Sequence, residues 1–284
     1  MQASLRESCG RIGPLHTVGV EESSVGTLDG KTGLIFGVAN HNSIAWAIAQ
    51  KLAAEGARLA FTYQGRMEQN VRKLTAANMP DAPVLSCDVQ NDEELDAVFD
   101  QVGKDLGGLD ILIHSVAFAP TDDLRGRVSH VSRAGFTAAL DISAYSLLAM
   151  AKRAEPLMQQ RGGGSVIAMT YLGSERVVPG YNLMGIAKAA LEASVRYLAW
   201  DLGPQNITVN GISAGPLRTL SARGVGNINA MFDLVEQVAP LRRNVEQSDI
   251  GDMAAFLCGP AARNLTGEIL HLDAGFHVMG LGTM

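Results

Sequence analysis

Short apolar runs alternate with longer helical patterns from Gly30 onward, and this alternation restricts the fold more than any other feature of the sequence. Seven runs have the length and composition of buried strands: residues 33–37, 58–63, 83–87, 109–114, 165–170, 207–212 and 269–272. Helical patterns occupy residues 43–54, 67–77, 92–106, 136–158, 183–202, 228–238 and 248–257. Strands that alternate with helices form a mostly parallel sheet with both faces covered, so the sequence predicts an α/β fold.

The end of the first predicted strand decides between a doubly wound sheet and a barrel. Gly37 closes that strand and leads into a helix of small residues, as a dinucleotide-binding fold requires, whereas a barrel places its phosphate site late in the chain. We therefore predict a single-domain, Rossmann-like, doubly wound sheet of seven parallel strands with helices on both faces. No Pro/Gly/Ser-rich linker divides residues 29–284, and residues 1–28 are predicted to be a flexible extension.

Composition narrows the possible functions. The 284 residues include 23 Lys and Arg against 29 Asp and Glu, a net charge of −6, which argues against a nucleic-acid partner. No apolar run reaches the roughly 18–20 residues of a membrane-spanning helix, so no membrane insertion is expected. Cys9, Cys87 and Cys258 are far apart and form no CxxC pair, which indicates a reducing cytoplasm and no metal site.

The segment from Gly37 to Ala45 is a candidate phosphate-binding turn. Gly37 allows the backbone to turn sharply, and Ser43 is predicted to be the N-cap of a helix whose N-terminus favours negative charge. The later glycines of the usual dinucleotide motif are Ser and Ala here. An ordinary strand–helix turn with a Ser cap is therefore an alternative interpretation of this segment.

The ends of the second and third predicted strands carry polar residues that suit an adenosine. Gln64 can hydrogen-bond the ribose, while the nearby Arg66 would instead favour a 2′-phosphate. Asp88 can accept a hydrogen bond from the adenine amino group with Val89 against the ring, although Asp88 could also be an N-cap. These residues favour NADH and leave NADPH possible.

Tyr181 and Lys188 are seven residues apart after the fifth predicted strand. In a continuous helix seven residues turn close to two full turns, so both side chains would share a face. A neighbouring ammonium favours the phenolate of a tyrosine, whose pKa is ordinarily about 10, and strengthens the phenol as a donor. Tyr145 and Lys152 have the same spacing, but we interpret that pair as structural because no strand end lies beside it.

Three further segments follow the ends of strands and could enclose the same cleft. Residues 114–119 are mostly small or apolar and suit a flat ring and an acyl chain. Residues 212–216 could offer free backbone groups to a carboxamide. Residues 217–231 contain glycines and apolar side chains and are predicted to form a substrate lid, with a mobile surface loop as the alternative.

These residues together resemble the enoyl-acyl carrier protein reductases of bacterial fatty-acid synthesis, within the short-chain dehydrogenase/reductase superfamily. The resemblance covers nearly all of residues 29–284. It rests on Gly37-x5-Ser43-x-Ala45, Phe61-Thr62-Tyr63-Gln64, Cys87-Asp88-Val89, His114-Ser115, Phe118-Ala119-Pro120, Tyr171-Leu172-Gly173, Tyr181-x6-Lys188 and Ile212-Ser213-Ala214-Gly215-Pro216. Most of the superfamily instead carries Tyr-x3-Lys and a Ser after strand five, where this chain has Gly185 and, in the region of the Ser, Tyr171.

The resemblance implies reduction of the 2,3 double bond of trans-2-enoyl-acyl carrier protein thioesters by hydride from NADH, the last step of fatty-acid elongation. Tyr181 would donate to the thioester oxygen, Lys188 would bind the nicotinamide ribose, and Tyr171 would shape the pocket. With the observations above, the expected cofactor-binding residues are Gly37, Ser43, Ile44, Gln64, Asp88, Val89, Val116, Lys188, Ile212, Ser213, Ala214, Gly215, Pro216 and Thr219, and the substrate-binding residues are Ala119, Tyr171 and Tyr181.

The resemblance also implies acyl carrier protein as the partner and a cytoplasmic homotetramer. Two alternatives remain open from the residues alone. One is another member of the superfamily that acts on a ketone or alcohol, and the other is a non-catalytic dinucleotide-binding protein on the same scaffold.

Overall fold

The computed structural model describes residues 26–219 and 228–280 and contains one seven-stranded sheet in the order β3-β2-β1-β4-β5-β6-β7. All six neighbouring pairs are parallel. The strands are β1 (Thr32–Phe36), β2 (Arg58–Tyr63), β3 (Val84–Ser86), β4 (Ile111–His114), β5 (Gly164–Thr170), β6 (Ile207–Ala214) and β7 (Ile269–Leu272). The predicted doubly wound α/β fold is confirmed, with strand ends within one or two residues of those expected.

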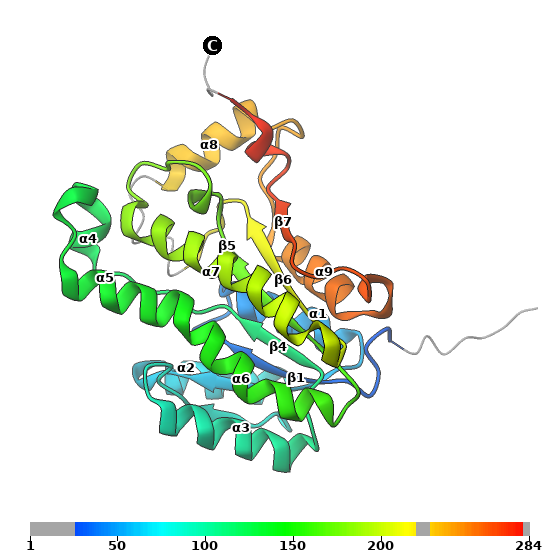
Figure 1. Ribbon diagram of the computed structural model, residues 1–284. Helices are drawn as coiled ribbons and strands as arrows, with labels where there is room; N and C mark the ends of the chain where they lie inside the picture. The colour runs from blue at the N-terminus through cyan, green and yellow to red at the C-terminus, as the bar shows by residue number, and fades with distance from the viewer. Residues whose placement is uncertain (1–25, 220–227, 281–284) are drawn as a thin grey trace, which may run out of the picture.

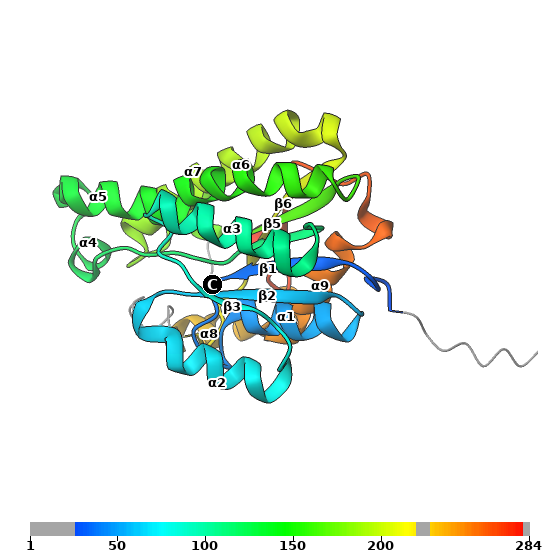
Figure 2. The same cartoon turned by 90° about the horizontal axis from the view of Figure 1, so that it is seen from below.

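Helices cover both faces of the sheet (Figure 1). When the sheet is viewed edge-on, α3, α6 and α7 lie on one side and α1, α2 and α9 lie on the other (Figure 2). The longer helices are α1 (Ile44–Ala54), α2 (Glu68–Asn78), α3 (Asp92–Leu106), α5 (Arg133–Leu140), α6 (Ser146–Gln159), α7 (Asn182–Leu202), α8 (Ile228–Val238) and α9 (Gln247–Cys258). A short helix that the sequence did not indicate, α4 (Thr121–Arg125), follows the end of β4.

Alternate side chains of the central strands enter two separate cores. In β1, Leu34 and Phe36 pack with the α3–α6–α7 layer, while Ile35 packs with the α1–α9 layer, and all three are buried. A strand covered on both faces needs apolar residues at every position. This is why the strand signals were continuous apolar runs rather than alternating ones.

The long helix predicted at residues 136–158 is interrupted. Five residues, Asp141–Tyr145, form a π-turn between α5 and α6. A π-turn accommodates one extra residue and is frequent at functional sites. It gives the segment two faces: Ile142 lines a cavity beside the sheet, while Ala144 packs in the core.

The combined helical run Arg133–Gln159 is also longer and more apolar than the sequence suggested. Its 27 residues have a mean hydropathy of 1.3 in the most apolar window, enough in length and composition to cross a membrane. Half of that window is buried inside the protein. Burial of this kind is typical of a helix that packs in a protein core.

The predicted N-terminal extension ends earlier than residue 28. Leu28 is fully buried, and its amide donates to the carbonyl oxygen of Glu55 over 2.9 Å. Thr27 donates to the Glu55 carboxylate. Residues 26–28 thus belong to the folded body, and residues 1–25 lie outside the described part of the chain.

Candidate active site

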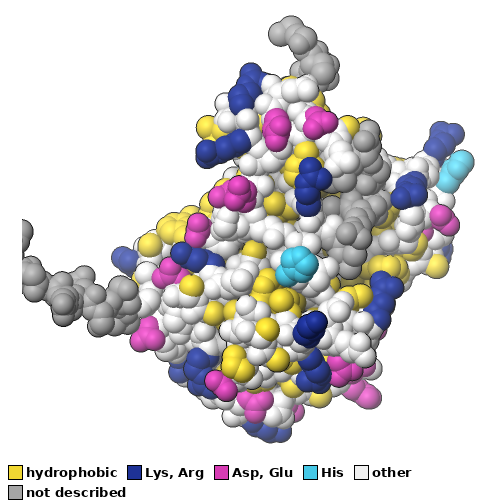
Figure 3. Space-filling model, turned by 180° about the vertical axis from the view of Figure 1, so that it is seen from behind, with side chains coloured by type: hydrophobic (Ala, Val, Ile, Leu, Met, Phe, Trp, Pro, Cys, Tyr) yellow, Lys and Arg dark blue, Asp and Glu magenta, His cyan; other side chains and the backbone are white. Residues whose placement is uncertain are grey.

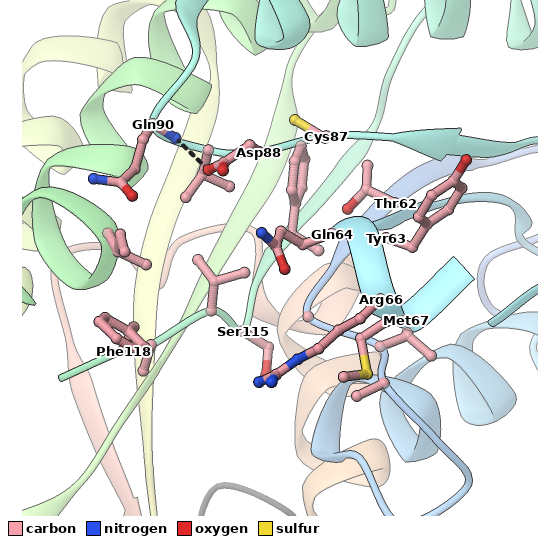
Figure 4. Close-up of a pocket in the computed structure, with 18 residues that line it drawn as sticks. Thr62, Tyr63, Gln64, Arg66, Met67, Cys87, Asp88, Gln90, Ser115 and Phe118 are labelled. Carbon is pink, nitrogen blue, oxygen red and sulfur yellow. Dashed lines mark hydrogen bonds between the residues drawn. The ribbon is translucent and has the colours of Figure 1, made fainter. Parts of the chain in front are cut away.

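A cavity of about 650 Å³ lies beyond the carboxyl ends of β1, β2, β3 and β4. This is where the strand order reverses, because β1 lies between β2 and β4, and such switch points are where doubly wound sheets bind ligands. The structure brings five predicted cofactor-binding residues to its wall: Gly37, Gln64, Asp88, Val89 and Val116. Figure 4 shows the polar side chains that enter the cavity from the ends of β2 and β3.

Gly37 is required by the backbone at this switch point. Its φ is +102°, a conformation that residues with a side chain rarely adopt, and a Cβ there would fall on the carbonyl oxygen of Ser115. The chain after β1 therefore passes directly against the chain after β4. Only glycine allows this close approach.

Ser43 occupies the N-cap position of α1, as predicted, but its side chain does not cap that helix. Its Oγ instead accepts hydrogen bonds from the backbone amides of Ala39 and Asn40, each over 3.0 Å. The hydroxyl thus closes the turn behind Gly37. Ile44 begins α1 and packs at the edge of the core.

Asp88 is not a helix cap, so the alternative interpretation of this residue is wrong. The N-cap of α3 is Asn91, whose side chain accepts from the amides of Glu93 and Glu94. The Asp88 carboxylate accepts from the amide of Gln90 over 3.1 Å (dashed line in Figure 4) and lies on the cavity wall.

Gln64 and Arg66 lie on the same wall of the cavity, between β2 and α2. Both side chains are exposed, and Figure 4 shows them in the same part of the cavity. The amide and the guanidinium are therefore both available to a ribose or to a phosphate on it.

Tyr171 and Tyr181 meet beyond the end of β5. Their rings pack edge to face with centroids 4.9 Å apart. Gly173 makes this possible, because a Cβ at that position would collide with the Tyr181 ring. Gly185 approaches the same turn, since a Cβ there would lie 2.6 Å from the Gly173 carbonyl oxygen. A lysine at residue 185, as in Tyr-x3-Lys, would not fit.

Lys188 extends from α7 to the end of β5. It is almost fully buried, and its Nζ donates to the carbonyl oxygen of Met169 over 2.7 Å. Burial lowers the pKa of this ammonium to about 8, and the carboxylate of Glu192 opposes that shift. Tyr181 stands at the N-cap of α7, so the seven-residue spacing to Lys188 is almost wholly helical, as predicted.

The tyrosines are neutral phenols in this site. Burial raises the pKa of Tyr171 to about 12, with a contribution from Asp273. Burial also raises the pKa of Tyr181, and the neighbouring Tyr171 and Glu192 add to the effect. The expected shift of Tyr181 toward the phenolate is therefore absent, because the cost of burying a charge dominates.

The end of β6 offers fewer free backbone groups than expected. The strand continues to Ala214, which pairs with Leu272, and the Gly215 amide donates to the Leu272 carbonyl oxygen over 2.8 Å. Ile212 and Ser213 are likewise paired within the sheet, with Met169 and Thr170 of β5. Pro216 begins the segment that leaves the sheet.

The predicted lid is described only in part, because residues 220–227 lie outside the described chain. The Thr219 amide donates to the Leu217 carbonyl oxygen. In α8, the sulfur of Met231 lies 3.0 Å from the Tyr171 hydroxyl. The second half of the predicted lid thus contacts one of the predicted substrate-binding residues.

Ala119 and Tyr181 lie in one small apolar cluster with Leu124, Met184 and Ala187. No group of three potential metal-ligating side chains is present among the described residues.

Sequence reasoning missed several groups that the structure adds. The carbonyl of Ser115, which faces Gly37, lies in the segment 114–119, for which we predicted contacts with a ring and an acyl chain but not this backbone contact. Ile142 was not predicted to line the cavity, because the sequence of its helix gives no signal for a π-turn. Glu192 lies four residues after Lys188, a spacing that places both on one side of a helix and could have revealed the pair.

Comparison with known families gives one match over most of the chain. The family described as "Enoyl-(Acyl carrier protein) reductase" matches residues 37–277. The enoyl-[acyl-carrier-protein] reductase [NADH] FabI of Nostoc sp. is 53% identical over 258 residues, covering 89% of this chain and 99% of the relative. The enzyme of Staphylococcus aureus strain MRSA252, named as the [NADPH] form, is 51% identical over 254 residues, covering 89% and 98%.

Solved structures agree with these relatives. The Bacillus cereus enoyl-acyl carrier protein reductase, crystallised with NADP+ and indole naphthyridinone, superposes with a TM-score of 0.88 at 51% identity, covering 90% of this chain and all of that one. The Anaplasma phagocytophilum enzyme in complex with NAD has a TM-score of 0.86 at 42% identity, covering 91% and 98%.

Proposed function

Because the chain belongs to the enoyl-acyl carrier protein reductase family, we propose that Tyr181, Lys188 and Tyr171 perform its reaction beside the cavity at the sheet's switch point. The protein is an NAD(P)H-dependent oxidoreductase that reduces the 2,3 double bond of enoyl-acyl carrier protein thioesters, the last step of fatty-acid elongation.

The residues present fit a nicotinamide dinucleotide. Gly37 provides a cradle that a Cβ would fill, and the N-terminus of α1 lies directly behind it. Asp88 and Val89 suit the adenine, and Gln64 suits its ribose. When bound, the reduced nicotinamide supplies the hydride that is added to the β-carbon of the enoyl thioester.

Tyr181 is the hydrogen-bond donor in this proposal. Addition of hydride to the β-carbon places negative charge on the thioester oxygen, and a neutral phenol at hydrogen-bond distance stabilises that charge. The raised pKa of Tyr181 keeps its proton in place until the charge develops. Since the site is buried, this donor is stronger than it would be in water.

Lys188 supplies the positive charge of the site. Its ammonium is oriented by the Met169 carbonyl at the end of β5, where it would hold the nicotinamide ribose. Tyr171 packs edge-on against Tyr181 and holds its ring in one orientation. Met231 on α8 would close the acyl-binding side, as expected of a lid.

The observation that supports this assignment most directly is the position of Tyr181, which is half-buried against Tyr171, and of the buried Lys188, which reaches the end of β5. The test is to mix purified protein with trans-2-enoyl thioesters of several chain lengths and record the absorbance of the reduced nicotinamide. We expect loss of absorbance that depends on the thioester. An absence of turnover with either cofactor at all chain lengths would refute the proposal.

The same assay distinguishes an enoyl reductase from the main alternative, a reductase of ketones. A reductase of ketones would consume the cofactor with a 3-ketoacyl thioester, and Gly185 together with Tyr171 argues against that chemistry. We expect no oxidation of cofactor with the 3-ketoacyl substrate at concentrations that saturate the enoyl reaction.

NADH is proposed as the preferred cofactor. Gln64, a neutral amide at the cavity, suits an unmodified ribose hydroxyl, while Arg66 lining the same cavity provides one cation for a 2′-phosphate. We therefore expect turnover with both cofactors and a higher kcat/KM with NADH.

The remaining proposals concern the surroundings of the enzyme. We propose acyl carrier protein as the substrate carrier, residues 29–284 as one reductase domain with a lid at 217–231, and a cytoplasmic location. Cys87 and Cys258 are free, in keeping with a reducing compartment. On the face in Figure 3, basic side chains are mixed with acidic and apolar ones, which does not favour a nucleic-acid partner there.

A homotetramer is also proposed. Large apolar side chains are exposed on several elements, among them Tyr197 and Trp200 on α7, Leu148 on α6 with Tyr145 just before it, and Phe256 on α9. Exposed large apolar side chains that gather on a surface are commonly covered by another subunit. Light scattering coupled to size-exclusion chromatography should give four times the mass of the chain.

A further inference from the structure

Glu192 is a buried carboxylate on α7 that the proposed reaction does not use. It is 5% exposed, and two hydroxyl groups donate to the same carboxylate oxygen, Oε1. The donors are Thr170 at the end of β5 and Ser174 in the turn that follows Tyr171, both over 2.6 Å. Hydrogen bonds of this length to an ionised oxygen are among the stronger ones in proteins.

These bonds connect the two segments that carry the catalytic side chains. Thr170 directly precedes Tyr171, and Ser174 closes the turn whose first residue is Tyr171. Glu192 lies on the helix that begins after Tyr181 and carries Lys188 one turn earlier. A single carboxylate thus holds the turn after β5 against the side of α7.

Glu192 is also the negative charge that acts on Lys188. The Lys188 charge acts on His114 from β4, while Glu192 and Tyr171 act on Tyr181 at the start of α7. Both tyrosines are neutral phenols. Burial and the Lys188 charge lower the pKa of His114 to about 3, so it too is neutral. Asp273 acts on Tyr171 from beyond β7.

Burial of a lone ammonium is costly, and a nearby opposite charge offsets that cost. Among the described residues, the ion pairs within 4.0 Å include neither Lys188 nor Glu192, so the two charged groups are not in direct contact. The carboxylate of Glu192 therefore compensates the charge of Lys188 without occupying the hydrogen bonds that the ammonium would give to a ribose.

We propose that Glu192 is a positioning residue of the reductase: its carboxylate keeps Lys188 charged, and its bonds to Thr170 and Ser174 fix the turn that carries Tyr171 against α7. This inference rests on the proposed roles of Tyr171, Tyr181 and Lys188 and adds a fourth residue to them.

Glu192→Gln is the main test, because it preserves the shape of the side chain and an acceptor oxygen while it removes the charge. Without the carboxylate, Lys188 should lose its proton at lower pH. We expect the alkaline limb of the kcat/KM profile for NADH to move down by about one pH unit. The NADH dissociation constant, measured by fluorescence over the same pH range, should show the same shift.

Recovery of NADH binding at low pH distinguishes a lost charge on Lys188 from a damaged fold. At pH 6.5 the variant should bind NADH within about twofold of the wild type, since Lys188 is charged in both proteins. Asp201→Asn is the matched control, because it removes one exposed carboxylate from the same helix. Its pH profile should coincide with that of the wild type.

Ser174→Ala and Thr170→Val test the hydroxyl bonds separately from the charge. Each should lower kcat by up to about tenfold through misplacement of the Tyr171 turn, with the alkaline limb unchanged. If Glu192→Gln does not fold, these two variants decide the question. A kcat equal to that of the wild type in both would then overturn the proposal.

An unshifted alkaline limb in a folded Glu192→Gln protein would also overturn it. Failure of the proposed function looks different, because the wild type itself would then show no turnover of enoyl thioesters. A wild type that turns over, with a Glu192→Gln profile identical to it, would refute only the role of Glu192.

Discussion

The two halves of the proposed cofactor-binding edge differ in the groups that form them: backbone in one half and individual side chains in the other. The proposed adenosine side, beyond β1 to β4, is an open cavity where the backbones at Gly37 and Ser115 pass directly against each other. The proposed catalytic side, beyond β5, holds the buried Lys188 and Glu192 together with a half-buried Tyr181. The first half depends on shape and the second on individual buried side chains. Substitutions should therefore act through different quantities in the two halves.

Tyr181→Phe should produce the largest effect, because it removes the proposed donor from the buried half. We expect kcat to fall by about 10²–10⁴-fold, the usual contribution of a positioned acid, while the KM for NADH changes little. Steady-state kinetics with an enoyl thioester measures both. Tyr145→Phe is the control, since Tyr145 has the same spacing to a lysine but lies exposed on the π-turn. Full activity of Tyr181→Phe would show that another group is the hydrogen-bond donor.

Lys188→Met should follow, with a loss of about 10²–10³-fold in kcat/KM and weaker NADH binding. The methionine fills the buried space but leaves the Met169 carbonyl without its donor. Lys152→Met, at the exposed lysine with the same spacing, should behave as the wild type. Fluorescence titration with NADH gives the affinity, and an unchanged dissociation constant would contradict the ribose contact.

Gly37→Ala tests the shape-dependent half. Its Cβ would strain the backbone and displace Ser115, so we expect NADH affinity to fall at least about tenfold and the thermal midpoint to drop. Gly30→Ala is a matched control, because Gly30 also has a positive φ of +72° but has open space around it. If both variants lose affinity equally, strain alone rather than the close approach is responsible.

His114 offers a smaller effect, on stability rather than activity. Burial and the Lys188 charge lower its pKa from 6.5 to about 3. Between these values the unfolded chain binds a proton that the folded chain does not, so stability falls as pH falls, by about 1.4 kcal/mol per unit. His114→Gln should therefore lose less stability than the wild type when acidified from pH 6.5 to 4.5.

Thermal unfolding of His114→Gln and the wild type at several pH values measures this difference. The exposed His130 provides the control as His130→Gln. Parallel pH dependence of the wild type and His114→Gln would show that His114 does not titrate on unfolding.

Much of the fold could be predicted because its signals are local. The strand at 33–37 was evident from its apolar run, and α3 was located to the residue at both ends from its helical pattern, although its N-cap is Asn91 and not Asp88. Tyr181 and Lys188 were singled out by their spacing and by the strand before them. The boundaries at β6 were less accurate, since Ser213 and Ala214 pair with distant residues of β7.

The parts that could not be predicted depend on contacts between distant residues. Ser43 looked like a helix cap, yet its hydroxyl serves the preceding turn. The direction of the Tyr181 pKa shift depends on burial, which the local sequence does not reveal. The role of Glu192 depends on hydroxyls 18 and 22 residues away, on different elements.

The π-turn at Asp141–Tyr145 has a consequence for which sides of one helical run face the cavity and the core. Each residue of an α-helix rotates the next by about 100°, so one inserted residue puts α5 and α6 out of phase. The Ser143 hydroxyl then makes two hydrogen bonds with the backbone of Phe118: it donates to the carbonyl oxygen and accepts from the amide. Leu147 meanwhile keeps its place between the layers. One continuous helical run can therefore present Ile142 to the cavity and still keep the apolar side of α6 in the core.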